Sequence, residues 1–208
     1  MRLLALLPAL ALAGCATHAV IKDEPVTRVE DPAWAGKTVL ITPRYSQPAT
    51  GLFSGNDPLP AAKLEDAEKG SDVPAQLDAF RQALADTLPA GTRAVTSGAH
   101  DFELVAELTA YDAEGPAYAD YRVGPTLIKR IITVGLGSAE YFITADYTLK
   151  LKLLGPDGNL LQSRGFQIQE RLRHQSDWHD GWSEMDDLKL ALFKRTLNRA
   201  LTEFNQRQ

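Results

Sequence analysis

The clearest hydrophobic pattern in the chain is a strict alternation of apolar and polar residues between positions 143 and 153. The apolar positions fall on every second residue: Ile143, Ala145, Tyr147, Leu149, Leu151 and Leu153. A period of two is typical of a strand with one buried face. Residues 155–159 (Gly-Pro-Asp-Gly-Asn) have turn composition, because proline presets φ and glycine or asparagine accepts positive φ. With residues 160–172 as the returning strand, the pattern predicts a long hairpin.

Two segments instead repeat their apolar residues at helical spacing. The first begins near Asp72, which is suited to an N-cap, and ends before Pro89; its apolar face consists of Leu77, Phe80, Leu84 and Leu88. The second opens with Ser183 and Asp186, which resemble a capping box. Its apolar face consists of Leu190, Phe193, Leu197, Leu201 and Phe204. Each stripe predicts an amphipathic helix packed on a sheet.

Two further segments predict strands. Residues 38–42 form a short β-rich run that we expect to stop at Pro43, and residues 102–110 alternate like a half-buried strand. Residues 44–70 and 114–125 are rich in glycine, proline or polar residues, which favours loops. The order of elements predicts a single α+β domain, with a mostly antiparallel sheet and two helices packed on one face.

The N-terminus carries an apolar run from Leu3 to Ala13 after Arg2. This run is too short for the roughly 20 residues of a permanent membrane span and is typical of an export signal. The signal ends in Leu12-Ala13-Gly14-Cys15, which resembles the lipobox of bacterial lipoproteins. The resemblance implies that residues 1–14 are a signal peptide, removed by cleavage before Cys15, and that the Cys15 thiol carries a diacylglyceryl group.

Cys15 is the only cysteine in the chain, so no disulfide can form within the chain. The alternative to a lipobox is an ordinary secretory signal that happens to contain a cysteine. In known lipoproteins an aspartate after the lipidated cysteine favours retention in the inner membrane, and here that position is Ala16. The resemblance therefore implies an anchor in the outer membrane, with the protein on the periplasmic face.

Residues 15–36 are polar, contain two prolines and show no periodicity, so we predict a disordered tether followed by a periplasmic domain over residues 37–208. The net charge is −5, with both signs interspersed. This pattern does not favour nucleic-acid binding, which uses clustered basic residues. The expected partners are the membrane, through the lipid, and an envelope protein. No cofactor is predicted.

Residues 125–139 combine apolar residues with Gly135 and Gly137. A phosphate-binding loop would need a helix after the glycines, whereas a strand is predicted there. The segment is therefore either core or an apolar contact surface. Arg130, the run Gly135-x-Gly137-x-Ala139 and the following hairpin resemble an uncharacterised family of bacterial lipoprotein domains of unknown function, over about residues 38–170. The order of elements is also similar to lipoprotein domains that assist envelope transport and assembly machines. Neither resemblance implies a catalytic residue.

Residue types that bind metals gather in one segment near the C-terminus. The candidates are His174, Asp177, His179 and Asp180, with Glu184, Asp186 and Asp187 further on. No H-E-x-x-H signature is present, and acidic residues also favour the positive end of a helix. Since no catalytic set is evident, we predict a non-enzymatic binding or assembly module for an envelope protein complex. The alternative is a metal-dependent periplasmic hydrolase that uses His174 and His179.

Overall fold

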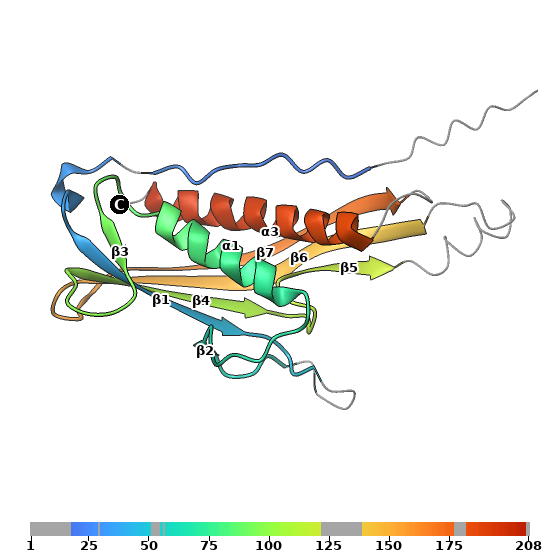
Figure 1. Cartoon of the computed structure of the whole chain (residues 1–208), viewed down its shortest axis with the longest axis horizontal. Coiled ribbons are helices and arrows are strands. Elements are labelled where there is room, and N and C mark those ends of the chain that lie inside the picture. Colours follow the sequence, from blue (N-terminus) through green and yellow to red (C-terminus); the bar gives the residue numbers. More distant parts are fainter. Residues whose placement is uncertain are drawn as a thin grey trace, which may run out of the picture.

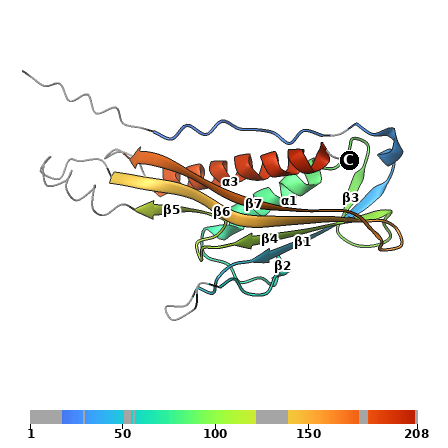
Figure 2. The ribbon, with the colours of Figure 1, turned by 180° about the vertical axis from the view of Figure 1, so that it is seen from behind.

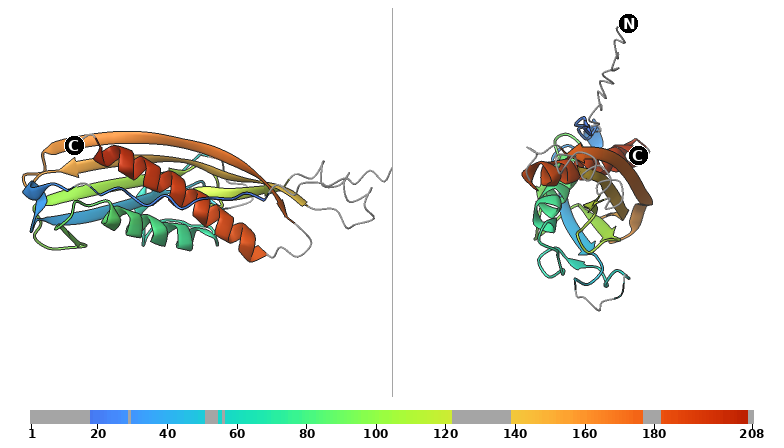
Figure 3. Two further views of the ribbon diagram at one scale, coloured as in Figure 1. Left: turned by 90° about the horizontal axis from the view of Figure 1, so that it is seen from above. Right: turned by 90° about the vertical axis from the view of Figure 1, so that its right-hand side faces the viewer.

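The computed structural model describes residues 18–28, 30–50, 55, 57–121, 139–176 and 182–206. Two helices lie on one face of an elongated sheet (Figure 1), and from behind the strands lie in front of both helices (Figure 2). Seen end-on, the sheet curves around the helical layer (Figure 3). The predicted α+β class is confirmed. No helix in the described part of the chain is long and apolar enough to cross a bilayer.

The sheet has seven strands in the order β2-β1-β4-β6-β5, with β3 also paired to β1 and β7 also paired to β6. Their bounds are β1 Thr38–Ser46, β2 Ala62–Lys63, β3 Arg93–Val95, β4 Phe102–Ala110, β5 Ala117–Tyr121, β6 Ala139–Leu154 and β7 Leu160–Ser176. β1 runs parallel to β3 and β4, and the other pairs are antiparallel. The sheet is therefore mixed but mostly antiparallel, as predicted.

The β6–β7 hairpin confirms the strongest sequence pattern. Every second residue of β6 from Ile143 to Leu153 is buried against the helices, and Lys150 and Lys152 face solvent. Both strands are longer than predicted. β6 begins at Ala139 and β7 ends at Ser176, so the hairpin extends beyond the part of the sheet that β4 covers.

The helices span Val73–Asp86 (α1) and Trp182–Asn205 (α3). Apart from Leu190, which lies outside the core, their predicted apolar stripes form the core with β6, where Phe193 packs edge-on to Tyr147 with ring centroids 5.5 Å apart. Asp72 occupies the predicted N-cap position of α1, but its side chain makes no capping hydrogen bond and instead pairs with Lys189 on α3. The predicted capping box is wrong, because Ser183 lies inside α3 and Asp186 pairs with Lys189 as well.

The strand predictions fail where local composition was misleading. β1 continues through Pro43, which lies in the gap between β3, paired as far as Leu40, and β2, paired from Arg44. A proline is tolerated there because no strand on that side needs its missing N–H. The predicted loops at 44–70 and 114–125 contain β2 and β5, and β3 was not predicted.

Residues 18–28 form a strap, by which we mean the extended segment that lies beside α3 (Figures 1 and 3). We predicted these residues as part of a disordered tether. Instead, Ile21 and Val26 pack against the core, the Thr27 amide donates to Thr202 Oγ1 at 3.0 Å, and Arg28 pairs with Asp86 at 2.7 Å. The strap contains few apolar residues, and they are not regularly spaced. The sequence therefore shows no hydrophobic periodicity from which its docking could be predicted.

Candidate functional site

A cleft of about 990 Å³ lies where the N-terminal ends of α1 and α3 approach β5 and the beginning of β6. Ligand pockets in proteins have volumes of about 300–1,000 Å³. Its lining residues come from five separate stretches of the chain: Thr50, Lys69, Gly70, Ser71, Asp72, Ala113, Glu114, Ala119, Tyr121, Tyr141, Met185, Asp186 and Lys189. The cleft is therefore assembled by the tertiary fold.

Lys189 is the electrostatic centre of this cleft. Its side chain is only 8 % exposed, and its Nζ lies 2.7 Å from both Asp72 Oδ2 and Asp186 Oδ1. Burial opposes the ammonium charge, but the hydrogen bonds to Asp186 and Asp72 outweigh burial and raise the pKa of Lys189. The hydrogen bond from Lys189 in turn lowers the pKa of Asp72. The ion pair between Lys189 and Asp72 thus ties the start of α1 to the second turn of α3, and both side chains keep their charges at neutral pH.

Two buried glutamines fix the loops around the cleft. Gln76 on α1 accepts from the Ala117 amide at 2.9 Å and donates to the Ala117 carbonyl at 3.0 Å, which attaches α1 to β5. Gln47 donates to the Ala113 carbonyl at 3.0 Å. Between them, Gly115 has a φ of 113°, and a Cβ there would approach Val73 Cγ2 to 2.8 Å. The cleft walls are consequently held by specific, buried hydrogen bonds.

The cleft combines aromatic and charged surface. Tyr121 and Tyr141 are cross-strand neighbours with ring centroids 5.2 Å apart, and Tyr121 is 43 % exposed. The ionisable side chains that line the cleft are two lysines (Lys69 and Lys189), three carboxylates and the two tyrosines. The described lining contains no histidine or cysteine, so it does not present a hydroxyl–histidine or thiol–histidine pair for nucleophilic catalysis. Exposed tyrosines beside polar groups are instead typical of protein-binding surfaces.

Glu114 tests the electrostatics of the cleft. Desolvation and the nearby Asp112 carboxylate raise its pKa above the ordinary 4.5, so the charged form destabilises the folded state at neutral pH. Glu114→Gln should therefore raise the free energy of unfolding at pH 7, by about 0.3 kcal/mol because the side chain still reaches solvent. The gain should shrink as the pH falls and disappear below 4.5, where Glu114 is protonated in both the folded and the unfolded chain. Urea titrations at both pH values measure this.

Glu68→Gln is the matched control. Hydrogen bonds from the backbone and side chain of Thr50 lower the pKa of Glu68, so its charge favours the folded state above the ordinary pKa, and this contribution is lost as the pH falls. The control should lower stability at pH 7, opposite in sign to Glu114→Gln. Equal shifts in the two variants would contradict the account of the cleft.

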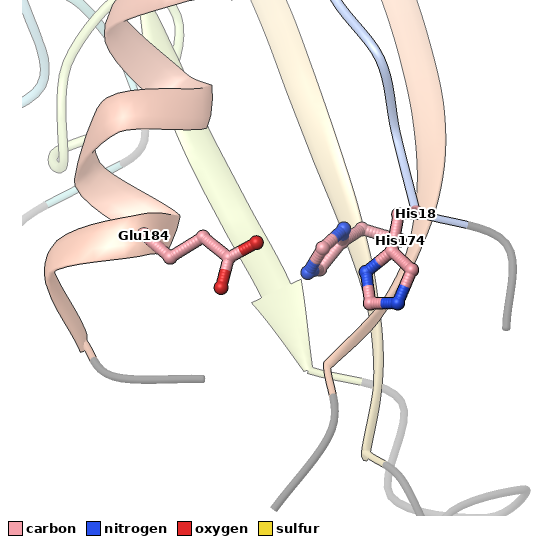
Figure 4. Close-up of side chains that lie close together, drawn as sticks. All are labelled: His18, His174 and Glu184. Atoms are coloured by element: carbon pink, nitrogen blue, oxygen red, sulfur yellow. The ribbon is translucent and has the colours of Figure 1, made fainter. Parts of the chain in front are cut away.

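A second cluster joins the strap to the sheet and to α3. His18 from the strap, His174 from β7 and Glu184 from the first turn of α3 converge (Figure 4), and one ligand atom of each lies within 4.8 Å of the others. His174 is fully buried, and its Nδ1 accepts a hydrogen bond from the Ala19 amide at 3.3 Å. Each of these residue types can bind a transition metal.

Only part of the metal-ligand prediction can be compared with this cluster. His174 and Glu184 were singled out from the sequence, and the structure brings them together. Asp177, His179 and Asp180 lie outside the described residues, as do Cys15 and residues 125–138. Sequence reasoning missed His18, because it lies more than 150 residues from His174 in a segment without periodicity. No signal in the sequence could have found that contact.

Solved structures resemble this chain, although its sequence matches no known family model and no curated protein. A DUF330 protein from Xanthomonas campestris is 16 % identical with a TM-score of 0.36, and the alignment covers 89 % of this chain and 91 % of that one. A Helicobacter pylori protein, described as a homologue of a neuraminyllactose-binding hemagglutinin, is 12 % identical with a TM-score of 0.44 and the same coverage. Likenesses this low carry no argument about function.

Proposed function

We propose that this protein is a non-enzymatic binding module of the bacterial envelope, held on the periplasmic face of the outer membrane by lipid on Cys15. In this proposal, the cleft around Lys189 receives a segment of an envelope protein. The observation that carries the proposal is the docking of the strap on α3. Because the strap begins a few residues after Cys15, its path determines how far the lipid anchor can lie from the cleft.

The strap runs along α3 in the direction of that helix. Its beginning, at His18, lies by Glu184 in the first turn of α3, and its end, at Thr27, lies by Thr202 in the last turns. His18 is the third residue after Cys15, a reach of at most about 11 Å. The cleft includes Met185 and Asp186, the two residues of α3 that follow Glu184. A lipid on Cys15 would therefore hold the cleft end of the domain near the membrane.

The character of the cleft supports a protein segment as its occupant. Its rim offers tyrosine rings, and its charged side chains come from the loop that leads into α1, from the connection between β4 and β5, and from α3. A peptide can use both kinds of surface, through side-chain contacts and through backbone hydrogen bonds. An assembly or transport complex of the envelope would supply such a segment.

Photo-crosslinking in intact cells tests the proposal. The photoreactive analogue p-benzoylphenylalanine would replace Tyr121 in the cleft or, as a control, Asp157 in the exposed hairpin turn. We expect a defined envelope protein to be captured from position 121 but not from position 157. Filling the cleft with Ala119→Trp should abolish that capture. Equal capture from both positions, or capture that survives Ala119→Trp, would contradict the proposal.

A further inference from the structure

We propose that His18, His174 and Glu184 form a binding site for one Zn²⁺ ion, which fastens the strap to the domain beside the lipid anchor. The three residues come from three separate elements, and even the two nearest in sequence, His174 and Glu184, are ten positions apart. Only the fold brings them together (Figure 4). The site uses a different ligand set from the cleft and is independent of what the cleft binds.

The ligand types and their separation suit zinc. Two imidazoles and one carboxylate are a common protein set for Zn²⁺, with water as the fourth ligand. Zinc–ligand bonds of about 2.1 Å place tetrahedral ligand atoms roughly 3.3 Å apart, whereas the three atoms here lie within 4.8 Å of one another. His18 is exposed and Glu184 half-buried, so both can rotate to close that difference around the buried His174.

The hydrogen bond from the Ala19 amide to His174 must break when zinc binds. Because Nδ1 accepts from the Ala19 amide, a neutral His174 ring carries its proton on Nε2. Zinc at Nε2 requires the opposite tautomer, and zinc at Nδ1 takes the place of the amide. In either case the Ala19 contact must give way, while His18 becomes directly tied to β7 and α3 through the metal.

This change gives the metal a positional role. The strap's beginning is held in the described residues by the Ala19 hydrogen bond and the contact between the His18 and His174 rings, whose centroids are 5.6 Å apart. Bound zinc would replace these contacts with a metal bridge that has one bond to His18 on the strap and two bonds to the domain, at His174 and Glu184. The orientation of the domain relative to the membrane would then depend on zinc.

Calorimetric titration of the detergent-purified full-length chain with ZnCl₂ tests the site. We expect one equivalent to bind, and His18→Ala, a change at an exposed side chain, to weaken binding more than about 10-fold, at least as much as losing an outer-shell partner of a zinc ligand. His100→Ala is the matched control and should bind like the wild type. Cys15→Ser should also bind, which excludes the thiol as a ligand. Mg²⁺ should not compete, because it prefers oxygen ligands.

Hydrogen exchange supplies a second readout. Zinc should slow exchange in the peptide covering residues 18–28 of the wild type and leave that peptide unchanged in His18→Ala. The proposal is overturned if no saturable binding occurs, or if His18→Ala binds zinc as the wild type does. The latter result together with loss of binding in His179→Ala would place a site among His179 and its neighbours instead.

Discussion

Cys15→Ser is expected to move the protein almost completely from the membrane fraction to the soluble fraction, or to leave an uncleaved precursor. The thiol is the only group in the chain that a diacylglyceryl transfer could use, because Cys15 is the only cysteine. Each buried methylene contributes about 0.8 kcal/mol to membrane binding, so two or more acyl chains make the difference between a stable anchor and none. Fractionation of cells, followed by immunoblotting, measures the distribution.

Arg28→Ala is the control that distinguishes membrane anchoring by lipid from the docking of the strap on the domain. This change removes the ion pair with Asp86 and the hydrogen bond to its carbonyl but leaves Cys15 unchanged. The variant should remain in the membrane fraction. If Cys15→Ser also remains there and is processed to the wild-type size, the protein is held by something other than lipid.

Phe193→Ala is expected to lower the free energy of unfolding by about 3–5 kcal/mol, the range for removing a buried aromatic side chain. Phe193 is fully buried between α3 and β6 and packs edge-on to Tyr147. Tyr147 also shares a hydrogen bond of 2.9 Å with Thr196 on the same helix. The cavity would therefore open at the place where α3 joins the centre of the sheet. Urea denaturation followed by circular dichroism measures the loss.

Lys194→Ala is the matched control, because Lys194 is the next residue and its side chain is exposed. Its effect should stay within about 0.5 kcal/mol. If Phe193→Ala were as mild as Lys194→Ala, α3 would not be packed on β6 as described.

The sequence predicted those parts of the fold in which one periodic pattern decides the structure. The β6–β7 hairpin, α1, α3 and β4 follow from apolar residues at a period of two or 3.6, because burial of one face outweighs other local preferences. Prediction from the sequence failed at β2, β3 and β5. These are short strands, and their pairing depends on a neighbouring strand that is already in place. Pro43 misled for the same reason, since its tolerance depends on which strand lies beside it.

The sites were less predictable than the fold. The cleft around Lys189 joins residues from Thr50 to Lys189. Asp72 was correctly placed at the start of α1, but its ion pair with Lys189 was missed because that contact is not encoded locally. His174 and Glu184 were recognisable as metal-binding residue types, but His18 was not, because the strap docks through a few scattered contacts. Side chains that meet through tertiary structure leave no spacing rule in the sequence.

The orientation of the domain on the membrane is the central claim, and lipid quenching measures it most directly. With Cys15 acylated, an introduced cysteine is the only free thiol, so Tyr121→Cys and Asp157→Cys can each carry one fluorophore in liposomes that contain spin-labelled lipid. Tyr121 pairs with Tyr141 near the start of β6, and the hairpin turn lies about 40 Å along that strand. We expect strong quenching at position 121 and little at position 157. Equal quenching, or stronger quenching at position 157, would contradict the account.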